Sequence, residues 1–150
     1  MHVGPFFLLF IFALMPAAVG AQPVGVSLIG EGRDNVMQNW EVSHEKWRAQ
    51  PKWHPSSTNP PPLPIAKAVE IADSWLRKRH ADVNKLALSQ VMLRTQSQTG
   101  HGVDERWFYR IEFQPVIAGR KVWGADLVAV VLFDGTVVVP RSEPYATTTK

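Results

Sequence analysis

The chain of 150 residues contains no cysteine. Disulfide bonds and thiol nucleophiles are therefore excluded, and so is the lipid anchor that bacterial lipoproteins attach to a cysteine. An exported domain without disulfides must be stabilised by packing alone. This favours a bacterial periplasmic or extracellular protein over a small disulfide-bonded eukaryotic scaffold.

The sequence also lacks an apolar run long enough to span a membrane, which requires about 20 residues. Its longest such run, Phe6–Met15, is followed by Pro16 and then by small residues up to Ala21. This pattern predicts a secretory signal peptide over residues 1–21, although no lysine or arginine precedes the run. An uncleaved membrane anchor is the alternative. We expect no stable membrane insertion once the leader has been removed.

A strong excess of charge is absent too. The formal net charge is +3, and the basic clusters are limited to Arg77-Lys78-Arg79 and Arg120-Lys121. A nucleic-acid-binding domain concentrates its basic residues on one face or stripe. We therefore expect no nucleic-acid partner for this chain.

Motifs that carry chemistry are missing as well. No serine lies in a Gly-x-Ser-x-Gly context, and no two histidines have the H-x-x-x-H spacing of a metal site. Gly100-His101-Gly102 stands between predicted strands, so it indicates a loop that binds no phosphate. The sequence predicts no metal and no cofactor, and a catalytic set formed only in space stays open.

Residues 22–62 have the composition of an extended arm that precedes the folded domain. The run Pro60-Pro61-Pro62 favours a stiff polyproline spacer. The arm also contains Trp40, Trp47 and Trp53, whereas disordered linkers are poor in aromatic residues. We expect these tryptophans to be buried by packing on the domain. A ligand platform is the alternative, because Trp40 and Trp47 are seven residues apart and would share one face of a helix.

A helix is predicted from Ile65 to the vicinity of His80–Asn84, with Pro64 in its first turn. Its apolar residues follow the three-four spacing of one helix face: Ile65, Ala68, Val69, Ala72, Trp75 and Leu76. Asp73 and Arg77 are four residues apart, in the favourable orientation for an ion pair on a helix. Such a helix needs a sheet to cover its apolar face.

Alternating and apolar runs after the helix predict a curved antiparallel sheet of about four strands. The strands are Leu86–Thr95, Arg106–Gln114, Val122–Phe133 with a bend at Gly124, and Thr136–Val139. Ala118-Gly119 and Asp134-Gly135 predict turns, the second of type I′. The fold class is therefore α+β, with one amphipathic helix packed on the sheet over residues 63–140 and a loose tail over residues 141–150.

The two faces of this sheet are expected to differ. One helix covers one face, yet Leu127–Phe133 is apolar on both sides. An open apolar patch is prone to aggregation, so we expect a cover, either the tryptophan-bearing arm or a second copy of the protein. The candidate interaction surface comprises Trp40, Trp47, Trp53, Val128, Val130 and Leu132. Self-association through the third and fourth strands is one use of this surface.

Residues 63–140 resemble the PepSY-like group of small exported bacterial modules and, more distantly, the cystatin-type helix-on-sheet fold. The resemblance rests on the helix Ala66–Leu76, the aromatic strand Trp107–Phe113 and the hairpin Phe133–Val137. It implies a non-catalytic module that restrains peptidases. It identifies no catalytic or inhibitory residue in this chain.

The sequence thus favours a non-catalytic exported module that binds a peptide, a peptidase or another envelope protein, for example by addition of a peptide to a sheet edge. The alternative from another class is a small cone-shaped α+β pocket enzyme that uses Asp126 as its base. Against this, Asp126 would face solvent at a strand bend or pair with Arg110 or Arg120. A structural envelope component is the third interpretation. A cavity lined by Asp126 and aromatic residues would favour the enzyme.

Overall fold

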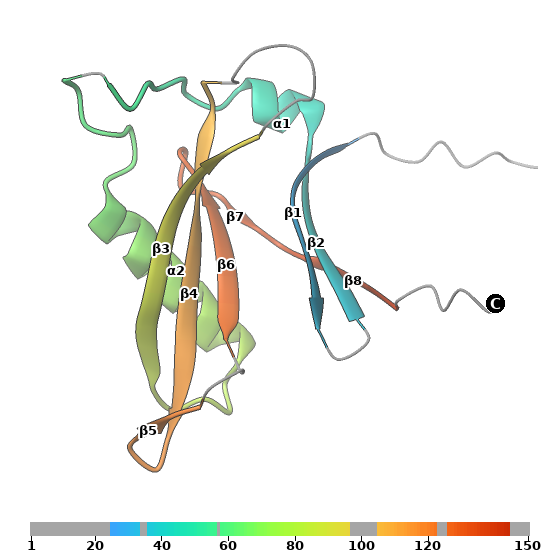
Figure 1. Ribbon diagram of the computed structural model, residues 1–150, viewed down its shortest axis with the longest axis vertical. Coiled ribbons are helices and arrows are strands. Elements are labelled where there is room, and N and C mark those ends of the chain that lie inside the picture. Colours follow the sequence, from blue (N-terminus) through green and yellow to red (C-terminus); the bar gives the residue numbers. More distant parts are fainter. Residues whose placement is uncertain (1–24, 34–35, 57, 97–104, 123–125, 145–150) are drawn as a thin grey trace, which may run out of the picture.

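The computed structural model describes residues 25–33, 36–56, 58–96, 105–122 and 126–144, which form an α+β fold of two open antiparallel sheets (Figure 1). One sheet has the strand order β3-β4-β6-β7, with β5 paired to β4, and the other has the order β1-β2-β8. The elements are β1 (Gly25–Arg33), β2 (Val36–Ser43), α1 (His44–Arg48), α2 (Ile65–Arg79), β3 (Leu86–Thr95), β4 (Trp107–Ile117), β5 (Arg120–Lys121), β6 (Leu127–Leu132), β7 (Val137–Val138) and β8 (Arg141–Pro144).

The α+β class is confirmed, but the expected single sheet of about four strands is wrong. A second sheet arises because the arm forms an antiparallel hairpin, β1–β2, whose strands pair from Gly25 with Ser43 to Arg33 with Val36. The first residues of the predicted tail, Arg141–Pro144, add β8 to this hairpin. Residues 1–24, with the expected leader, and residues 145–150 lie outside the described residues. No helix in the described ranges is long and apolar enough to cross a membrane.

Helix α2 lies across one face of the five-stranded sheet, as predicted (Figure 1). Ala68, Ala72 and Leu76 are buried, whereas Ile65 is 53% exposed and was wrongly assigned to the buried face. Ile65 is the first helical residue, and Pro64 precedes it as the N-cap. At that end the helix extends past the sheet, so the three-four spacing overestimates the length of the buried stripe.

Strand β4 shows the predicted alternation and supplies both faces of the five-stranded sheet. We call the side towards α2 the helix face; it includes Tyr109, Ile111, Ala129 and Val131, all buried in one apolar cluster. Burial raises the pKa of the Tyr109 hydroxyl, which donates a hydrogen bond of 2.7 Å to the carbonyl of Leu63. The end of the arm is thereby fixed to the helix face.

The opposite side, which we call the hairpin face, is covered by the arm. A second cluster joins residues of β1, β2 and α1 to residues of β4, β6 and β7: Val26, Ile29, Trp40, Val42, Trp47, Phe108, Val130, Leu132 and Val138. The ring of Trp47 meets the ring of Phe108 edge-on, with 6.2 Å between centroids. The second apolar side of β6 is therefore covered by the tryptophan-bearing arm of the same chain, which was the first of the two covers expected.

A polar network ties α1 to the turn between β6 and β7. Asp134 forms an ion pair with Lys46 at 2.7 Å and accepts a hydrogen bond of 3.0 Å from the Gln50 side chain. Its other carboxylate oxygen accepts 2.9 Å from the backbone of Thr136. Partial burial raises the pKa of Asp134, but the hydrogen bonds from Lys46, Gln50 and Thr136 outweigh it and hold that pKa well below its usual range. The Asp134 network therefore fastens the arm to the sheet.

Both predicted tight turns are present, but the type I′ geometry predicted for Asp134-Gly135 occurs at Ala118-Gly119, for which no turn type was predicted. Gly135 has a positive φ of 84°, its N–H donates to the carbonyl of Leu132, and the N–H of Leu132 donates to the carbonyl of Thr136. This is a three-residue loop with glycine in the left-handed position, so the predicted type I′ turn is wrong here. Ala118 and Gly119 both have positive φ between the paired residues Ile117 and Arg120, as a type I′ turn requires.

The long third strand predicted over residues 122–133 is shorter in the structure. Strand β6 begins at Leu127, and the two residues of β5 form a separate short pairing with β4. The expected bend at Gly124 falls at residues 123–125, which lie outside the described residues.

Candidate functional site

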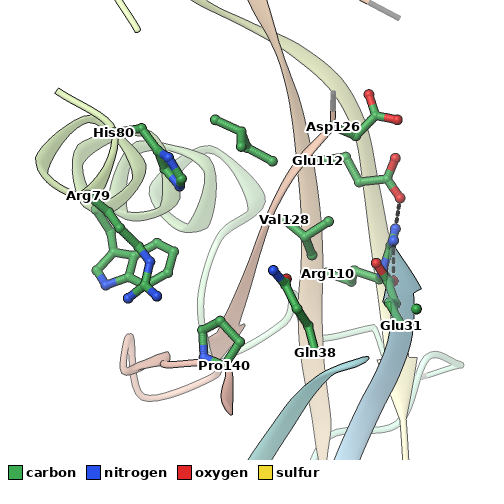
Figure 2. A pocket seen from close by; sticks show the side chains of 12 residues that line it. Glu31, Gln38, Arg79, His80, Arg110, Glu112, Asp126, Val128 and Pro140 are labelled. Atoms are coloured by element: carbon green, nitrogen blue, oxygen red, sulfur yellow. Dashed lines mark hydrogen bonds and ion pairs between the residues drawn. The ribbon is translucent and has the colours of Figure 1, made fainter. Parts of the chain in front are cut away.

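A cavity of about 440 Å³ lies where the C-terminal end of α2, the middle of β4, the start of β6 and the β1–β2 hairpin meet (Figure 2). Twelve residues line it: Glu31, Gly32, Gln38, Trp75, Arg79, His80, Arg110, Glu112, Asp126, Leu127, Val128 and Pro140. This size is within the range of small-molecule and side-chain pockets. We call it the Arg110 cavity.

One wall of the cavity is organised by Arg110, which is almost completely buried on the hairpin face. Its guanidinium forms ion pairs with Glu31 of β1 and with Glu112 of its own strand, and its Nε donates a hydrogen bond of 2.6 Å to Glu31 (Figure 2). The alternation of β4 places Phe108, Arg110 and Glu112 on the same side. On this face of β4 the apolar cluster therefore ends at Phe108, and a charged cluster begins at Arg110.

Asp126 adds a third carboxylate to this wall, directly before β6. Figure 2 shows it next to Glu112, with Val128 further along the same strand. The three carboxylates and the guanidinium of Arg110 therefore give this wall charges of both signs. The side chains of Leu127 and Val128 supply an apolar lining between the charged groups.

The opposite wall is the last turn of α2 and carries basic side chains. Figure 2 shows Arg79 and His80 on this side, across from Glu112 and Asp126. The guanidinium of Arg79 lies over the ring of Trp75, 5.4 Å from its centroid, in a cation–π contact. The helix C-terminus contributes about half a negative charge. Of the three cations in the last turn only Arg79 lines the cavity, because Arg77 pairs with Asp73 at 2.7 Å and Lys78 is absent from the lining.

The structure brings five of the six predicted interaction residues together and separates the sixth. Trp40, Trp47, Val128, Val130 and Leu132 all belong to the cluster between the arm and the hairpin face. Trp40 lies on β2 and Trp47 on α1, so the shared helix face expected for a ligand platform is wrong. Four of the five are buried, so these residues form an internal core in place of an open surface. Val128 also lines the Arg110 cavity.

Trp53, the sixth residue, packs on the helix face. Its ring makes edge-on contacts with the rings of Trp107 and Phe133, and its carbonyl accepts a hydrogen bond of 2.8 Å from the Trp107 indole. Its own indole N–H donates to the carbonyl of Asn59 at 2.9 Å. Trp53 therefore anchors the arm at the end of the sheet opposite the Arg110 cavity.

A second cavity of about 370 Å³ lies beside Trp53 and contains a serine next to a histidine. The Oγ of Ser56 is 2.6 Å from Nδ1 of His54, and the backbone N–H of Ser56 donates to the same nitrogen at 3.2 Å. Both residues are exposed and two positions apart, which is the geometry of a local turn. This pair gives no support to a nucleophilic site.

The sequence pointed to Asp126 but missed Glu31, Glu112 and Arg79 as members of one site. Arg110 and Glu112 carried a signal, because charged residues alternate there with large apolar ones in the clearest strand of the chain. Glu31 belonged to the arm, and only the fold of the β1–β2 hairpin brings it to the cavity. Within the described ranges no group of histidine, aspartate and glutamate side chains is arranged to hold a metal ion.

Comparison of the chain with family models, with curated proteins and with solved structures gives no match. The resemblance to PepSY-like and cystatin-type modules therefore stays a prediction.

Proposed function

We propose that this protein is a non-catalytic exported binding module that takes part of a peptide or protein partner into the Arg110 cavity. A peptidase or another envelope protein is the expected partner class, and the bacterial periplasm or cell exterior the expected location. The observation that carries this proposal is the cavity itself. It lies between two separately formed sheets and a helix end, and it presents fixed charges of both signs.

The chemistry of the cavity wall favours binding over catalysis. Among the described residues, its lining includes no serine, threonine, tyrosine, cysteine or lysine, so a nucleophile there would have to be His80 or a carboxylate. The guanidinium of Arg110 is engaged by Glu31 and Glu112, so these three groups hold one another in place. Fixed, mutually paired charges are suited to recognising the charge pattern of a ligand.

The pocket enzyme with Asp126 as base is the second candidate, and one observation favours it. Asp126 lines the cavity together with Trp75 and His80, as that interpretation requires. The two candidates differ in one measurable respect. A binding module releases its ligand chemically unchanged, whereas the enzyme would convert it, so mass spectrometry of recovered ligand separates them.

The experiment that tests binding is amide NMR of the mature chain during titration with mixtures of short peptides. We expect shifts at the backbone amides of Gly32, His80 and Val128, which come from three different elements of the cavity wall. The variant Val128→Phe fills the cavity and should abolish these shifts. Val139→Phe is the matched control, because Val139 is exposed and is absent from the cavity lining.

Shifts confined to other surfaces, or unchanged binding in Val128→Phe, would contradict the proposal. Thermal unfolding of both variants verifies that they retain the fold.

A further inference from the structure

We infer that the free edge of β3 binds an extended, acidic segment of a partner protein as an added strand. The segment would have apolar residues at alternate positions and an acidic residue opposite Arg94. This edge is separate from the Arg110 cavity, so the inference adds a second interaction surface to the proposed function.

Strand β3 is the longest strand at an edge of either sheet (Figure 1). Within the described ranges β4 is its one neighbour, and β3 has ten residues, compared with two in β7 at the other edge. Strand β1 is an edge strand of nine residues, but three of these are glycines, which offer a partner no side chain to pack on. Strand β3 contains neither glycine nor proline, so it is the best site for strand addition.

The register of β4 shows which backbone groups β3 directs at this edge. Val116 donates its N–H to the carbonyl of Lys85 at 2.8 Å, so Val116 faces β3. Because the direction alternates along a regular antiparallel strand, Arg110 also faces β3, where it pairs with Met92. The two neighbours of Met92 therefore direct their N–H and C=O groups away from β4. These neighbours are Val91 and Leu93.

The side chains of β3 set the alternation of the partner, because residues opposite one another in a sheet share a face. Val91 and Leu93 pack against the helix-face cluster and are partly exposed. Leu88, opposite the buried Phe113 of that cluster, is 46% exposed and extends the apolar strip beyond the register shift of β3. The residues added beside this strip would therefore be apolar.

Arg94 determines the charge of the partner. It is exposed, it is the only charged residue of β3, and no other described residue forms an ion pair with it. A residue added opposite Arg94 would belong to a non-hydrogen-bonded pair, in which the side chains approach most closely. An acidic residue would be attracted there. A second copy pairing through β3 would leave Arg94 without a counter-charge, because β3 contains no acidic residue.

Amide NMR of the chain of residues 22–150 tests the inference with the peptide acetyl-Thr-Val-Glu-Val-Thr-Val-amide. We expect shifts at the amides of Val91 and Leu93, because their N–H groups gain hydrogen bonds. The shift at Met92 should be smaller, because Met92 already faces β4. Replacing the glutamate of the peptide by lysine should weaken binding about twofold to fivefold, the range for an exposed ion pair.

N-methylation of the peptide separates strand pairing from apolar contact alone. In the expected register the valines direct their N–H groups at β3, and the other three residues direct theirs away. Methylation of the three valine nitrogens should weaken binding about tenfold or more. The peptide methylated at the other three nitrogens is the matched control and should bind nearly as well as the unmodified peptide.

Two variants of the chain assign the contacts. Val91→Pro removes an N–H that β4 does not use, so binding should be lost and the fold retained, whereas Val91→Thr keeps the N–H and should bind. Arg94→Gln should remove the preference for the glutamate peptide over the lysine peptide. Lys121→Gln is its control, because Lys121 is an exposed basic residue of β5. Thermal unfolding verifies the fold of each variant.

Equal binding of the two methylated peptides would overturn the inference, and so would the absence of shifts at Val91 and Leu93. Self-association of the chain that Val91→Pro abolishes would assign this edge to a second copy and would also overturn it. None of these outcomes affects the proposed function, which is tested at the amides of Gly32, His80 and Val128.

Discussion

The helix face and the hairpin face of the five-stranded sheet are both covered, but by different means. The helix face is apolar over the whole contact with α2, from Leu63 to Phe133. The hairpin face is apolar at one end, around Phe108 and Leu132, and charged at the other, around Arg110. The apolar helix face contributes only to the stability of the fold. The hairpin face combines a buried apolar part with a charged part that lines the Arg110 cavity.

The difference follows from the kind of cover. A helix presents a continuous stripe of side chains at three-four spacing, so one amphipathic helix closes an apolar face completely. The β1–β2 hairpin packs apolar side chains on only one end of the opposite face. At the other end, the ion pair between Glu31 and Arg110 joins the hairpin to the sheet.

Removal of residues 22–62 is the most disruptive test of this comparison. It exposes the apolar end of the hairpin face, including Val130 and Leu132, and removes Trp53 from the helix face, while α2 remains in the chain. We expect aggregation or self-association, because a large open apolar patch seeks a cover. Size-exclusion chromatography with light scattering, compared with the chain of residues 22–150, measures the result. A soluble monomer would show that the arm is dispensable as a cover.

Truncation of one buried leucine on each face should give the next largest loss of stability. Leu76 and Leu132 are both buried, one on α2 and one on β6 towards the hairpin. Leu76→Ala and Leu132→Ala should each lower the free energy of unfolding by about 2–5 kcal/mol. Urea denaturation followed by tryptophan fluorescence measures this. If Leu132→Ala separates the transition into two steps, the hairpin unfolds independently and the two faces do not form one cooperative unit.

A substitution at the charged end of the hairpin face should lower the free energy of unfolding by less. Arg110→Met removes the partner of Glu31 and Glu112, and leaving a buried carboxylate unpaired costs about 3–5 kcal/mol. Because Glu31 is partly exposed, water offsets part of this, and we expect a loss of about 2–3 kcal/mol. Adding Glu112→Gln to Arg110→Met should recover part of the loss. A double variant less stable than the single one would contradict this account.

The Asp134 network should contribute a smaller and pH-dependent amount. Its pKa is lower in the folded chain than its ordinary value of 3.8. The stabilisation is thus fully present above that value and is lost as the pH falls towards the lowered pKa. Asp134→Asn should lower the free energy of unfolding at pH 7 by about 1–2 kcal/mol, the low range for hydrogen bonds to a charged group with partial exposure.

Chemical denaturation of the variant and the unmodified chain at pH 7 and pH 3 measures this. The difference between the two proteins should be smaller at pH 3, and an unchanged difference would exclude the carboxylate as its source.

The type I′ turn at Ala118-Gly119 belongs to neither face and should give the smallest effect. Ala118 has a φ of 50°, which costs an L-residue about 1–2 kcal/mol. Ala118→Gly should raise the free energy of unfolding by about 0.5–1 kcal/mol, because the relieved strain is partly offset by the greater freedom of glycine in the unfolded chain. Ala81→Gly, at an exposed residue without positive φ, is the control and should be neutral or destabilising. Thermal unfolding compares them.

The helix face could be predicted from the sequence because its elements are local and periodic. The three-four spacing of α2 and the alternation of Trp107–Phe113 each lie within one element. The hairpin face could not be predicted in the same way, because the glycines of β1 and the prolines after α1 gave residues 22–62 the composition of a spacer. A signal was present: Trp40 and Val42 alternate with Glu41 and Ser43, and Asp34-Asn35, a pair common in turns, separates the two strands in sequence.

The Arg110 cavity required tertiary information. Glu31, Arg79 and Arg110 come from β1, α2 and β4. Arg110 alternates with large apolar residues in its strand, but no sequence pattern links it to Glu31 or Arg79. Their proximity depends on where the hairpin docks, and that in turn depends on Trp40 and Trp47 filling the apolar end of the same face.

The path of the chain after β7 has a mechanical consequence. Pro140 lines the Arg110 cavity, and Arg141–Pro144 then pairs with β2, where Ser142 is opposite Gln38, another cavity residue. A load applied at the C-terminus would therefore pull on the hairpin before it reaches the five-stranded sheet. Tethering the protein to a surface by this end would strain the wall of the cavity around Gln38 and Pro140 before the apolar contact beneath α2.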